Sequence, residues 1–288
     1  MTWQGFLCEL TGERVSPADC LACAQAGGGS RGDTLCPWTP ALIRGLTQNG
    51  KPRGLVAYSA TELLGCLRKV RLQEETPFWT QPSALYARFR GQLGHTLLAG
   101  CAGEGAVIEE RYYADLDGHL LTGQPDAVYP ARKLVVDYKT TARLPGTWKV
   151  YRCPKCGYAL YAGSGALRAK RTCSACDDGV EYTVRELALE ESPPRPYGHH
   201  VQQLSLYRWL LAQNGIAITT GEIVYLDMSG VLRLRVALTP LEEVAAFLQE
   251  RLAILTADEL PPSIRKDDPE AWQCRYCDVA AACAEAPN

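Results

Sequence analysis

The sequence of 288 residues has no apolar run approaching the ~18 residues that a membrane-crossing helix needs, so we expect no membrane association. It begins without the basic and apolar stretches of a secretory signal peptide, which favours a cytoplasmic protein. Because 47% of the residues are hydrophobic and only 22% are charged, collagenous and disordered classes are excluded. No helix-turn-helix pattern is apparent, which disfavours the redox- or zinc-sensing regulator that the number of thiols alone suggests.

Cysteine, by contrast, is abundant: the chain contains 13, an odd number. A secreted scaffold held by disulfides would be much shorter, and this chain is long enough for one large or two modest domains of roughly 150 residues. In a reducing compartment, thiols are kept for metal binding or for chemistry. The sequence therefore predicts a metalloprotein.

Four cysteines in the middle of the chain have the spacing CxxC, sixteen residues, CxxC. Each CxxC turn directs two thiolates toward one point, and two such turns complete a tetrahedron around zinc. The alternative, four unligated thiols in a polar loop, would leave them open to oxidation. We predict a zinc-ribbon insertion over residues 148–180 with the ligands Cys153, Cys156, Cys173 and Cys176.

A second group of cysteines lies within residues 1–50, with spacings of eleven, two and twelve residues. This segment is rich in glycine and turn-forming residues, has little apolar periodicity and would need a metal to be ordered. A second zinc site and a loose N-terminal arm are both consistent with it. The candidate ligands are Cys8, Cys20, Cys23 and Cys36.

The third group, within residues 270–288, has the spacing CxxC, five residues, C, and lacks a local fourth ligand. Three thiolates can bind zinc with a distant partner, or three corners of a 4Fe–4S cluster. Cys66 is the candidate fourth ligand, on a helix that a capping box from Ser59 to Glu62 opens. The remaining Cys101, beside an apolar stretch, is expected to be a buried, inert thiol. The group itself is Cys274, Cys277 and Cys283.

The pattern of apolar residues predicts an α/β fold. Helical spacing indicates helices over 84–99 and 198–214, and a last long helix that begins with proline at its first position and a capping box. Alternation and turn residues indicate two hairpins and a separate third strand. The predicted strands are 107–114, 120–129, 133–140, 222–227 and 231–238.

Four polar residues on this frame fit metal-dependent phosphodiester chemistry. Asp126 lies near the end of the second strand, and Asp137 and Lys139 share one face of the third because strand side chains alternate. Two carboxylates near one point can hold a divalent cation that acidifies a water, and the lysine can orient that water. His95 on the preceding helix could complete the ligand set and would favour Mn²⁺ over Mg²⁺.

Each of these residues has an ordinary explanation when it is taken alone. A single histidine on an apolar helix is more often a core residue, and an Asp-x-Lys pair on a strand is usually a solvated edge pair. Gln203 and Tyr207 share a helical face through their spacing of four, which also occurs by chance. The order and context of all these residues together favour a site.

Four short motifs, taken together, resemble those of RecB-like nucleases in the PD-(D/E)XK superfamily. In chain order they are Gly91-Gln-Leu-Gly-His95, Gly123-Gln-Pro-Asp126, Asp137-Tyr-Lys139 and Gln203-x3-Tyr207. Cys66 with the C-terminal cysteines resembles the split staple of the iron–sulfur branch, which includes CRISPR-associated exonucleases and the AddB-type nuclease domain. The resemblance covers roughly residues 55–285.

The resemblance implies a restriction-endonuclease-like core, with a central mixed sheet flanked by helices, in a nuclease domain over residues 51–288. The implied activity is a metal-dependent DNA exonuclease acting at single-stranded ends. Its implied setting is CRISPR adaptation or DNA end processing, with an integrase or a helicase as a protein partner. An alternative is a non-catalytic DNA-binding scaffold subunit of a larger nuclease, helicase or integrase complex.

Individual residues receive roles from the same resemblance. The implied ligands of Mn²⁺ or Mg²⁺ are His95, Asp126, Asp137 and the carbonyl of Tyr138. The implied catalytic residues are Asp126, Asp137, Lys139, Gln203 and Tyr207. The implied 4Fe–4S ligands are Cys66, Cys274, Cys277 and Cys283. The chain departs from the family at Leu67, where proline is common, in the inserted ribbon and in the N-terminal cysteine segment.

The formal net charge of −2 does not indicate a nucleic-acid-binding protein, but the distribution of charge does. Residues 148–176 contain six Lys and Arg and no acid. Aromatic residues are interleaved with them, a mixture that can follow a phosphate backbone while stacking bases. Exposed ribbons are also polar without any such role. The candidate DNA contacts are Lys149, Arg152, Arg168, Lys170 and Arg171.

Overall fold

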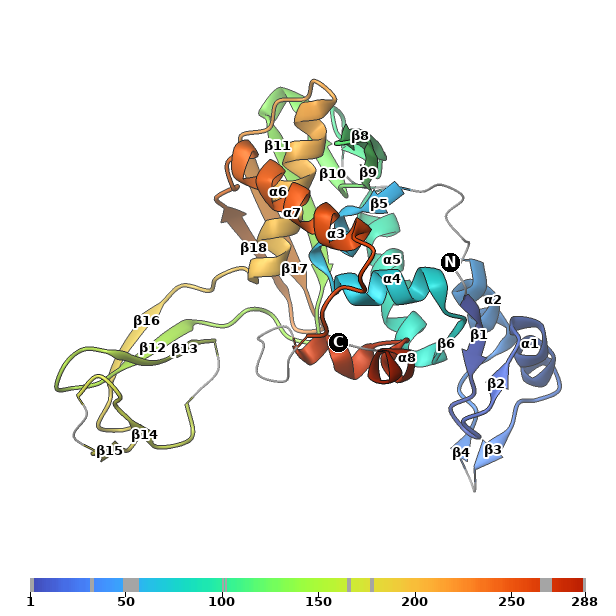
Figure 1. The fold of residues 1–288 in the computed structure, drawn as a ribbon, viewed down its shortest axis with the longest axis horizontal. Helices are drawn as coiled ribbons and strands as arrows, with labels where there is room; N and C mark the ends of the chain where they lie inside the picture. The colour runs from blue at the N-terminus through green and yellow to red at the C-terminus, as the bar shows by residue number, and fades with distance from the viewer. Residues whose placement is uncertain are drawn as a thin grey trace.

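A five-stranded mixed sheet forms the centre of the molecule, in the order β18-β17-β11-β10-β7 (Figure 1). Within it β11 and β17 are parallel and the other neighbours are antiparallel. Parallel neighbours need a crossover connection, which here contains an extended insertion and helix α6. The strands are β7 (Val107–Ile108), β10 (Ala127–Tyr129), β11 (Leu134–Thr140), β17 (Thr220–Leu226) and β18 (Val231–Val236). The computed structural model describes residues 3–31, 34–48, 57–99, 101, 103–164, 167–176, 179–264 and 271–286.

Strand β11 is a central strand because its first half, Leu134–Val136, is buried on both faces. Val135 lies on the side of helix α6 (Gly198–Gln213), and Leu134 and Val136 pack with Ala127 in a separate cluster. Val135 packs with Leu204 and Ile223 in the main hydrophobic cluster, and all three are 0% exposed. Burying each such side chain contributes about 1.5–3 kcal/mol. The structure confirms a mixed α/β protein, and the strand predicted over 133–140 is observed.

A smaller three-stranded sheet, β5-β9-β8, adjoins the first. The predicted strands over 107–114 and 120–129 are wrong as single strands, because the structure divides each of them between the two sheets. Pro125 has no backbone N–H to continue a ladder, so the chain leaves the small sheet after Gly123 and enters the large one at Ala127. The bounds are β5 (Ala57–Ser59), β8 (Tyr112–Leu116) and β9 (His119–Gly123).

The capping box predicted after β5 is present. The Ser59 hydroxyl accepts the Glu62 N–H, and the Glu62 carboxylate accepts the Ser59 N–H at 2.7 Å. The placement of Cys66 on the capped helix is wrong, because that helix ends at Leu64 and Cys66 occupies the N-cap position of the next one. The helices are α3 (Ala60–Leu64), α4 (Leu67–Glu75) and α5 (Pro82–Ala99).

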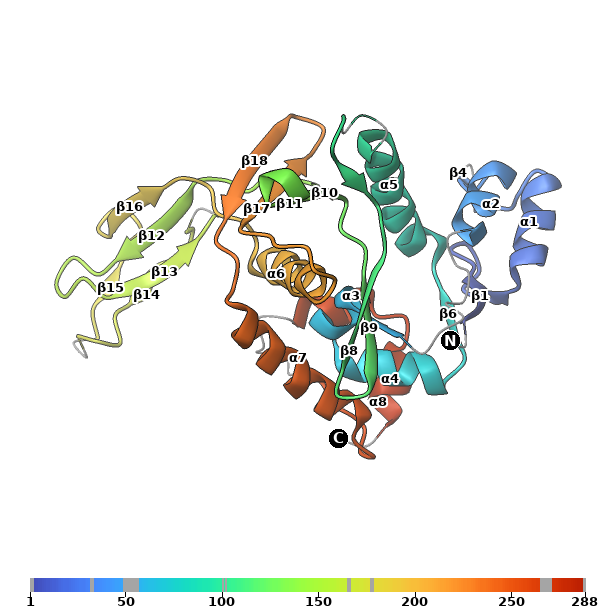
Figure 2. The same ribbon diagram turned by 90° about the horizontal axis from the view of Figure 1, so that it is seen from above.

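Two appendages lie at opposite ends of the molecule in both views (Figures 1 and 2). The inserted ribbon is closed by pairing of β12 with β16, from Trp148 opposite Ser192. Its strands are β12 (Trp148–Arg152), β13 (Ala159–Gly163), β14 (Arg171–Thr172), β15 (Glu181–Tyr182) and β16 (Ala188–Ser192). The N-terminal unit pairs its first strand in parallel with β6 of the body. Its elements and β6 are β1 (Trp3–Leu7), β2 (Arg14–Val15), α1 (Pro17–Gln25), β3 (Ser30–Arg31), β4 (Thr34–Leu35), α2 (Pro40–Gln48) and β6 (Phe78–Thr80).

The C-terminal segment packs against α4 (Figure 1). Arg68 of α4 is 1% exposed, and its guanidinium donates to the carbonyls of Pro261, Cys283 and Ala286. A buried charge is tolerated only when it is well bonded, so this arginine fixes the chain end to α4. The elements are a 3₁₀ turn η2 (Ala271–Tyr276) and α8 (Ala280–Glu285).

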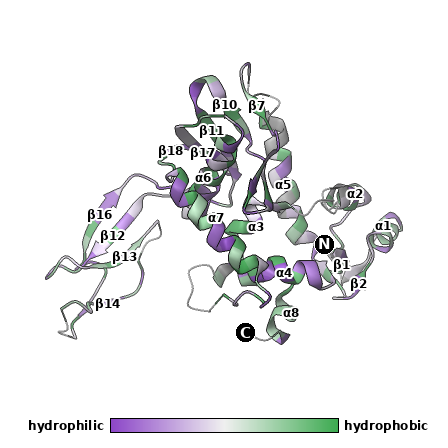
Figure 3. Ribbon diagram, turned by 45° about the horizontal axis from the view of Figure 1, so that its top comes forward, coloured by the Kyte–Doolittle hydropathy of each residue, from purple (hydrophilic) through white to green (hydrophobic). Residues whose placement is uncertain are grey.

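Helix α7 (Leu241–Thr256) packs on α6 through one apolar stripe, Val244, Leu248, Leu252 and Leu255. Figure 3 shows hydrophobic and hydrophilic residues side by side along it. The capping box predicted at its start is wrong, since Pro240 occupies the N-cap position and no side chain caps the helix there. Among the described residues, no helix combines the length and the apolar character needed to span a membrane.

Candidate active site and metal centres

A pocket of about 250 Å³ opens where the two sheets meet α3 and α6. Five residues that the sequence singled out as catalytic line this one pocket: Asp126, Asp137, Lys139, Gln203 and Tyr207. The remaining lining residues are Ser59, Ala60, Thr61, Gln92, Glu109, Arg111, Gly123 and Gln124. The fold thus brings together side chains that are distant in sequence.

Strand β11 supplies an acid and a base to the pocket. Asp137 and Lys139 are two residues apart and therefore face the same side of the strand. Asp137 is 1% exposed, and its Oδ2 lies 2.7 Å from Lys139 Nζ. The same Nζ donates to Gln203 Oε1 at 2.8 Å, so two acceptors fix the position of the ammonium group.

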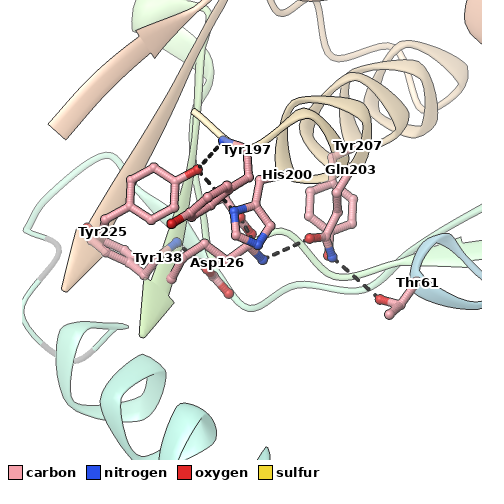
Figure 4. A network of polar contacts seen from close by, with 10 residues as sticks. Thr61, Asp126, Tyr138, Tyr197, His200, Gln203, Tyr207 and Tyr225 are labelled. Carbon is pink, nitrogen blue, oxygen red and sulfur yellow. Dashed lines mark hydrogen bonds and ion pairs between the residues drawn. The ribbon is translucent and has the colours of Figure 1, made fainter. Parts of the chain in front are cut away.

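Asp126 reaches the pocket because of the bend between β9 and β10. Its Oδ2 accepts the Tyr138 N–H at 2.6 Å, which ties the carboxylate to β11 beside Asp137 (Figure 4). Tyr138, whose carbonyl was predicted as a ligand, lies between Asp137 and Lys139 in sequence, and its side chain packs with Tyr129 in a separate cluster. The bend therefore places Asp126, which lies between the two sheets in sequence, in the pocket as a second buried acid.

Helix α6 supplies the amide and the phenol. The Gln203 amide donates to the Tyr207 hydroxyl at 2.9 Å and to Thr61 Oγ1 at 3.4 Å, which connects α6 with α3. Burial, with the charges of Asp137 and Asp126, raises the pKa of Tyr207 strongly, so its phenol stays protonated. Gly123 permits this close approach, because an added Cβ would lie 2.5 Å from Leu210 Cδ1.

A neutral histidine supports the start of α6 (Figure 4). His200 Nδ1 lies 3.0 Å from the Tyr225 hydroxyl, which also accepts the Tyr197 N–H at 3.0 Å. Burial, the charge of Lys139 and the neighbouring His199 lower the pKa of His200 to about 3. The imidazole is therefore uncharged at neutral pH.

Two charged residues of the pocket, Glu109 and Arg111, had no sequence signal, and Gln92 and Gln124 stood in the quoted motifs without an assigned role. Glu109 has a left-handed φ of 46°, and its N–H donates to the Asp126 carbonyl at 3.2 Å. Its own carbonyl accepts the Gln124 amide at 2.9 Å, and its carboxylate accepts the Gln92 amide at 3.4 Å. Arg111 donates to Gln124 Oε1. These contacts depend on the change of sheet at both divided strands, which periodicity does not show.

His95 lies on α5, and its side chain is outside the described residues. The backbone of α5 approaches the end of β11 closely, since a Cβ on Gly94 would lie 3.3 Å from Thr140 Cγ2. Gln92 of the same helix lines the pocket. The motif that contains His95 therefore runs beside the strand that carries Asp137.

The pocket lining fits a divalent cation. Its described charged residues are three acids, Glu109, Asp126 and Asp137, and two bases, Arg111 and Lys139, which leaves one net negative charge (3 − 2 = 1). Asp126 and Asp137 are 8% and 1% exposed, and buried carboxylates are costly without nearby positive charge. Hard cations such as Mg²⁺ and Mn²⁺ bind carboxylate oxygens. Asp126 and Asp137 are therefore suited to hold such an ion.

The four ribbon cysteines form a site that could bind a metal ion. Their sulfur atoms all lie within 4.8 Å of one another, with Cys153 and Cys176 at 3.7 Å and Cys156 and Cys173 at 3.6 Å. Although burial raises the pKa of Cys153, hydrogen bonds from the backbone N–H groups of Cys156 and Lys155 outweigh it and lower that pKa to about 6. A thiolate is the form that ligates metals.

The cysteines assigned to the iron–sulfur staple are more widely spaced than those of the ribbon. In the part of the chain that the structure describes, only the ribbon cysteines form a group whose sulfur atoms lie within 4.8 Å of one another. Burial raises the pKa of the Cys66 thiol, backbone N–H groups of Lys69 and Arg68 lower it, and the nearby thiols of Cys283 and Cys274 raise it. The pKa of Cys277 is raised by burial and, more weakly, by Cys66. The structure thus brings all four thiols into one neighbourhood.

The other cysteines divide between a shared pocket and the surface. A second pocket, of about 680 Å³, is lined by Cys8, Cys20, Cys23 and Cys36 of the N-terminal unit. Cys101 is exposed, so its prediction as a buried thiol is wrong. It follows the end of α5 in a turn, which carries it beyond the apolar stretch.

The basic residues of the ribbon face an acidic strand. Three of the five candidate DNA contacts are ion-paired: Lys149–Glu191 at 3.1 Å, Arg152–Glu190 at 3.0 Å and Lys170–Glu181 at 3.1 Å. Antiparallel pairing of β12 with β16 and of β14 with β15 places Glu190, Glu191 and Glu181 beside the basic run. The local excess of positive charge counted along the sequence is therefore largely offset, and a DNA-binding role for these residues stays a prediction.

The crystal structure of SSO0001 is similar to this chain at 16% identity, covering 86% of this chain and 96% of that one, with a TM-score of 0.51. At this identity the similarity concerns the fold alone. A crystal structure named "Putative exonuclease" from Eubacterium rectale is 12% identical and covers 91% of this chain and 86% of its own, with a TM-score of 0.34. No family model and no curated protein sequence matches the chain.

Proposed function

We propose that this protein is a divalent-metal-dependent DNA exonuclease with a RecB-like PD-(D/E)XK core. The observation that carries the proposal is the position of Lys139 Nζ, held between Asp137 and Gln203 in the pocket that also contains Asp126. An ordinary surface ion pair would not be buried beside a second acid. This arrangement suits hydrolysis of a phosphodiester.

Each side chain has a separate task in the proposed reaction. Asp126 and Asp137 would hold the cation, together with His95 and the Tyr138 carbonyl that the resemblance adds. When bound, the cation lowers the pKa of a water and neutralises charge on the phosphate. An ammonium has three donors, and Lys139 engages two in the contacts with Asp137 and Gln203. Its third donor is then directed to the attacking water or a phosphate oxygen.

Two further metal groups belong to the proposal. The close spacing of the four ribbon thiols supports a single zinc ion. The wider neighbourhood of Cys66, Cys274, Cys277 and Cys283 supports a 4Fe–4S cluster, which is larger than one ion and joins the C-terminal segment to α4. Single-stranded DNA ends as substrate, an integrase or helicase partner and a role in CRISPR adaptation or DNA end processing rest on the resemblance.

The decisive experiment compares Lys139→Ala with Lys133→Ala. Lys133 precedes the same strand, is exposed and lies outside the pocket, so it is a matched control for the loss of a lysine. Anaerobically prepared protein is incubated with end-labelled single- and double-stranded DNA and Mn²⁺ or Mg²⁺. Because electrostatic groups of this kind contribute on the order of 100-fold or more, Lys139→Ala should abolish detectable cleavage while Lys133→Ala keeps it.

The brown colour of an iron–sulfur cluster should be equal in both variants, which shows that the fold is intact. Cleavage that survives Lys139→Ala would refute the assigned site. DNA binding without any cleavage by the wild type would instead indicate the scaffold alternative.

A further inference from the structure

The four cysteines of the N-terminal unit come from separate elements but line one pocket. Cys8 follows β1, Cys20 and Cys23 lie on α1, and Cys36 follows β4. The thiols of Cys8, Cys23 and Cys36 lie near that of Cys20. A turn, a helix and a hairpin thus bring the four thiols to one pocket.

The turn at Cys8 repeats the turn at Cys153, which starts the thiol site of the ribbon. In both, the N–H of a glycine four residues on donates to the cysteine carbonyl, at 2.8 Å for Gly12 and 2.9 Å for Gly157. These glycines have left-handed φ values of +75° and +74°. The N–H of each cysteine also donates to the carbonyl five residues on, at 2.9 Å in both turns.

The sulfur environment of the two turns is also the same. The thiols of Cys8 and Cys153 each accept hydrogen bonds from the backbone N–H groups two and three residues later. The N-terminal unit therefore has, at Cys8, the same local geometry that the ribbon has at Cys153, the first cysteine of its close group of four sulfurs.

The unit has few other means of staying folded. Its buried hydrophobic cluster consists of Phe6, Ile43 and Leu46, and α1 buries none of its residues. Segments of about 40 residues seldom fold without disulfides, metals or an outside partner. A cross-link between α1 and the turns on both sides of it would supply the stability that the small core lacks.

We propose that Cys8, Cys20, Cys23 and Cys36 bind a structural zinc ion that holds the N-terminal unit against α5. Four protein thiolates leave no open position, which is typical of structural rather than catalytic zinc. The sulfurs are spaced more widely than in the ribbon, so binding one zinc ion would require them to move closer together.

Contacts with α5 extend the effect of this site toward the first pocket. Glu9, next to Cys8, accepts the Ser83 N–H at 2.9 Å at the start of α5 and the Trp38 indole N–H at 3.0 Å. Leu85 and Phe89 of α5 pack on the small core of the unit. One turn later Gln92 lines the candidate active site, so this consequence, unlike the zinc site itself, rests on the proposed function.

Metal content of the full chain tests the site. Protein is prepared anaerobically, and zinc and iron are measured by mass spectrometry in wild type, Cys20→Ser, Cys153→Ser and the exposed control Cys101→Ser. We expect about two zinc ions per chain in wild type and Cys101→Ser, and about one in the other two variants, with iron equal in all four. Two zinc ions in Cys20→Ser would overturn the proposal.

A conservative variant guards against simple misfolding. Cys8→His keeps a zinc ligand, so it should retain two zinc ions where Cys8→Ser retains one; equal loss in both would count against ligation by Cys8. Hydrogen exchange of residues 82–90 should quicken at least tenfold in Cys20→Ser and stay unchanged in Cys153→Ser. Unchanged exchange in Cys20→Ser would show that the zinc site does not stabilise α5. None of these readouts depends on DNA cleavage, so a failed nuclease assay leaves them decisive.

Discussion

In the candidate active site, Asp126, Lys139 and Gln203 come from a bend, a strand and a helix, whereas the ribbon thiols come from two CxxC turns of one insertion. The first arrangement needs both sheets and α6 to be packed before any side chain is placed. The second is set by local turn geometry and could be completed by a metal ion. The pocket should therefore be sensitive to changes in the body of the fold, and the ribbon should not.

The largest effect on this contrast is expected from Gly123→Ala. The added Cβ would lie 2.5 Å from Leu210 Cδ1 and 3.0 Å from two ring carbons of Tyr207, both on α6. Overpacking of this kind costs about 3 kcal/mol, at the upper end of its usual range, because a packed helix must move. Denaturant unfolding should show this loss, and cleavage should fall with it.

Gly198→Ala is the matched control, since a Cβ at this first residue of α6 meets no atom within 4 Å. Its stability should equal that of the wild type. The zinc content of the ribbon should be unchanged in both variants. A stable, fully active Gly123→Ala protein would show that the pocket does not depend on close packing of α6.

Much of this contrast could be read from the sequence. CxxC spacing is local, so the clustering of the ribbon thiols was predictable, and strand alternation placed Asp137 and Lys139 on one face. The bend at Asp126 was missed because Pro125 marks a change of sheet that periodicity does not register. Glu109 was missed for the same reason, and nothing about a glutamate in the sequence indicates the left-handed backbone conformation found there.

Charge pairing across strands was the other feature that the sequence concealed. The basic run of the ribbon and the acids of residues 181–191 are separate blocks in the chain, and only antiparallel pairing puts Lys149 beside Glu191. A charge count along the chain therefore overstates the field of a folded hairpin. The same limit applies to the pocket, where the acids and bases come from different elements.

A smaller effect is expected from pH through His200. The groups facing it are Lys139, His199, Tyr197 and Tyr225, and burial with the first two lowers its pKa from 6.5 to about 3. Below pH 6.5 the unfolded chain binds a proton at this histidine, whereas the folded chain does not bind it until the pH falls to about 3. Stability from this group is thus complete above pH 6.5 and is lost as the pH falls through that window, by about 2–3 kcal/mol at pH 4.5, two pH units below the unfolded pKa.

His200→Gln removes this titration while keeping a polar side chain. The stability difference between wild type and variant, measured by denaturant unfolding, should shift by that amount in favour of the variant between pH 7 and pH 4.5. Other carboxylates and thiols titrate in both proteins and cancel in the difference. Parallel pH curves would show that His200 is protonated in the folded state.

The smallest effect on the pocket is expected from removing the ribbon altogether. Trp148 and Ser192 are paired across β12 and β16, so a short glycine–serine linker can replace residues 148–192 without stretching the chain. Because the described ribbon residues are not among those lining the pocket, the stability of the body should change by less than about 1 kcal/mol. One zinc ion should be lost, and cleavage of short DNA should persist.

Since three of the ribbon's basic side chains are already paired with acids, the salt dependence of DNA affinity should change little. A steep loss of affinity and a shallower salt slope would instead show that the ribbon exchanges its internal ion pairs for phosphates, and that it belongs to the substrate-binding surface.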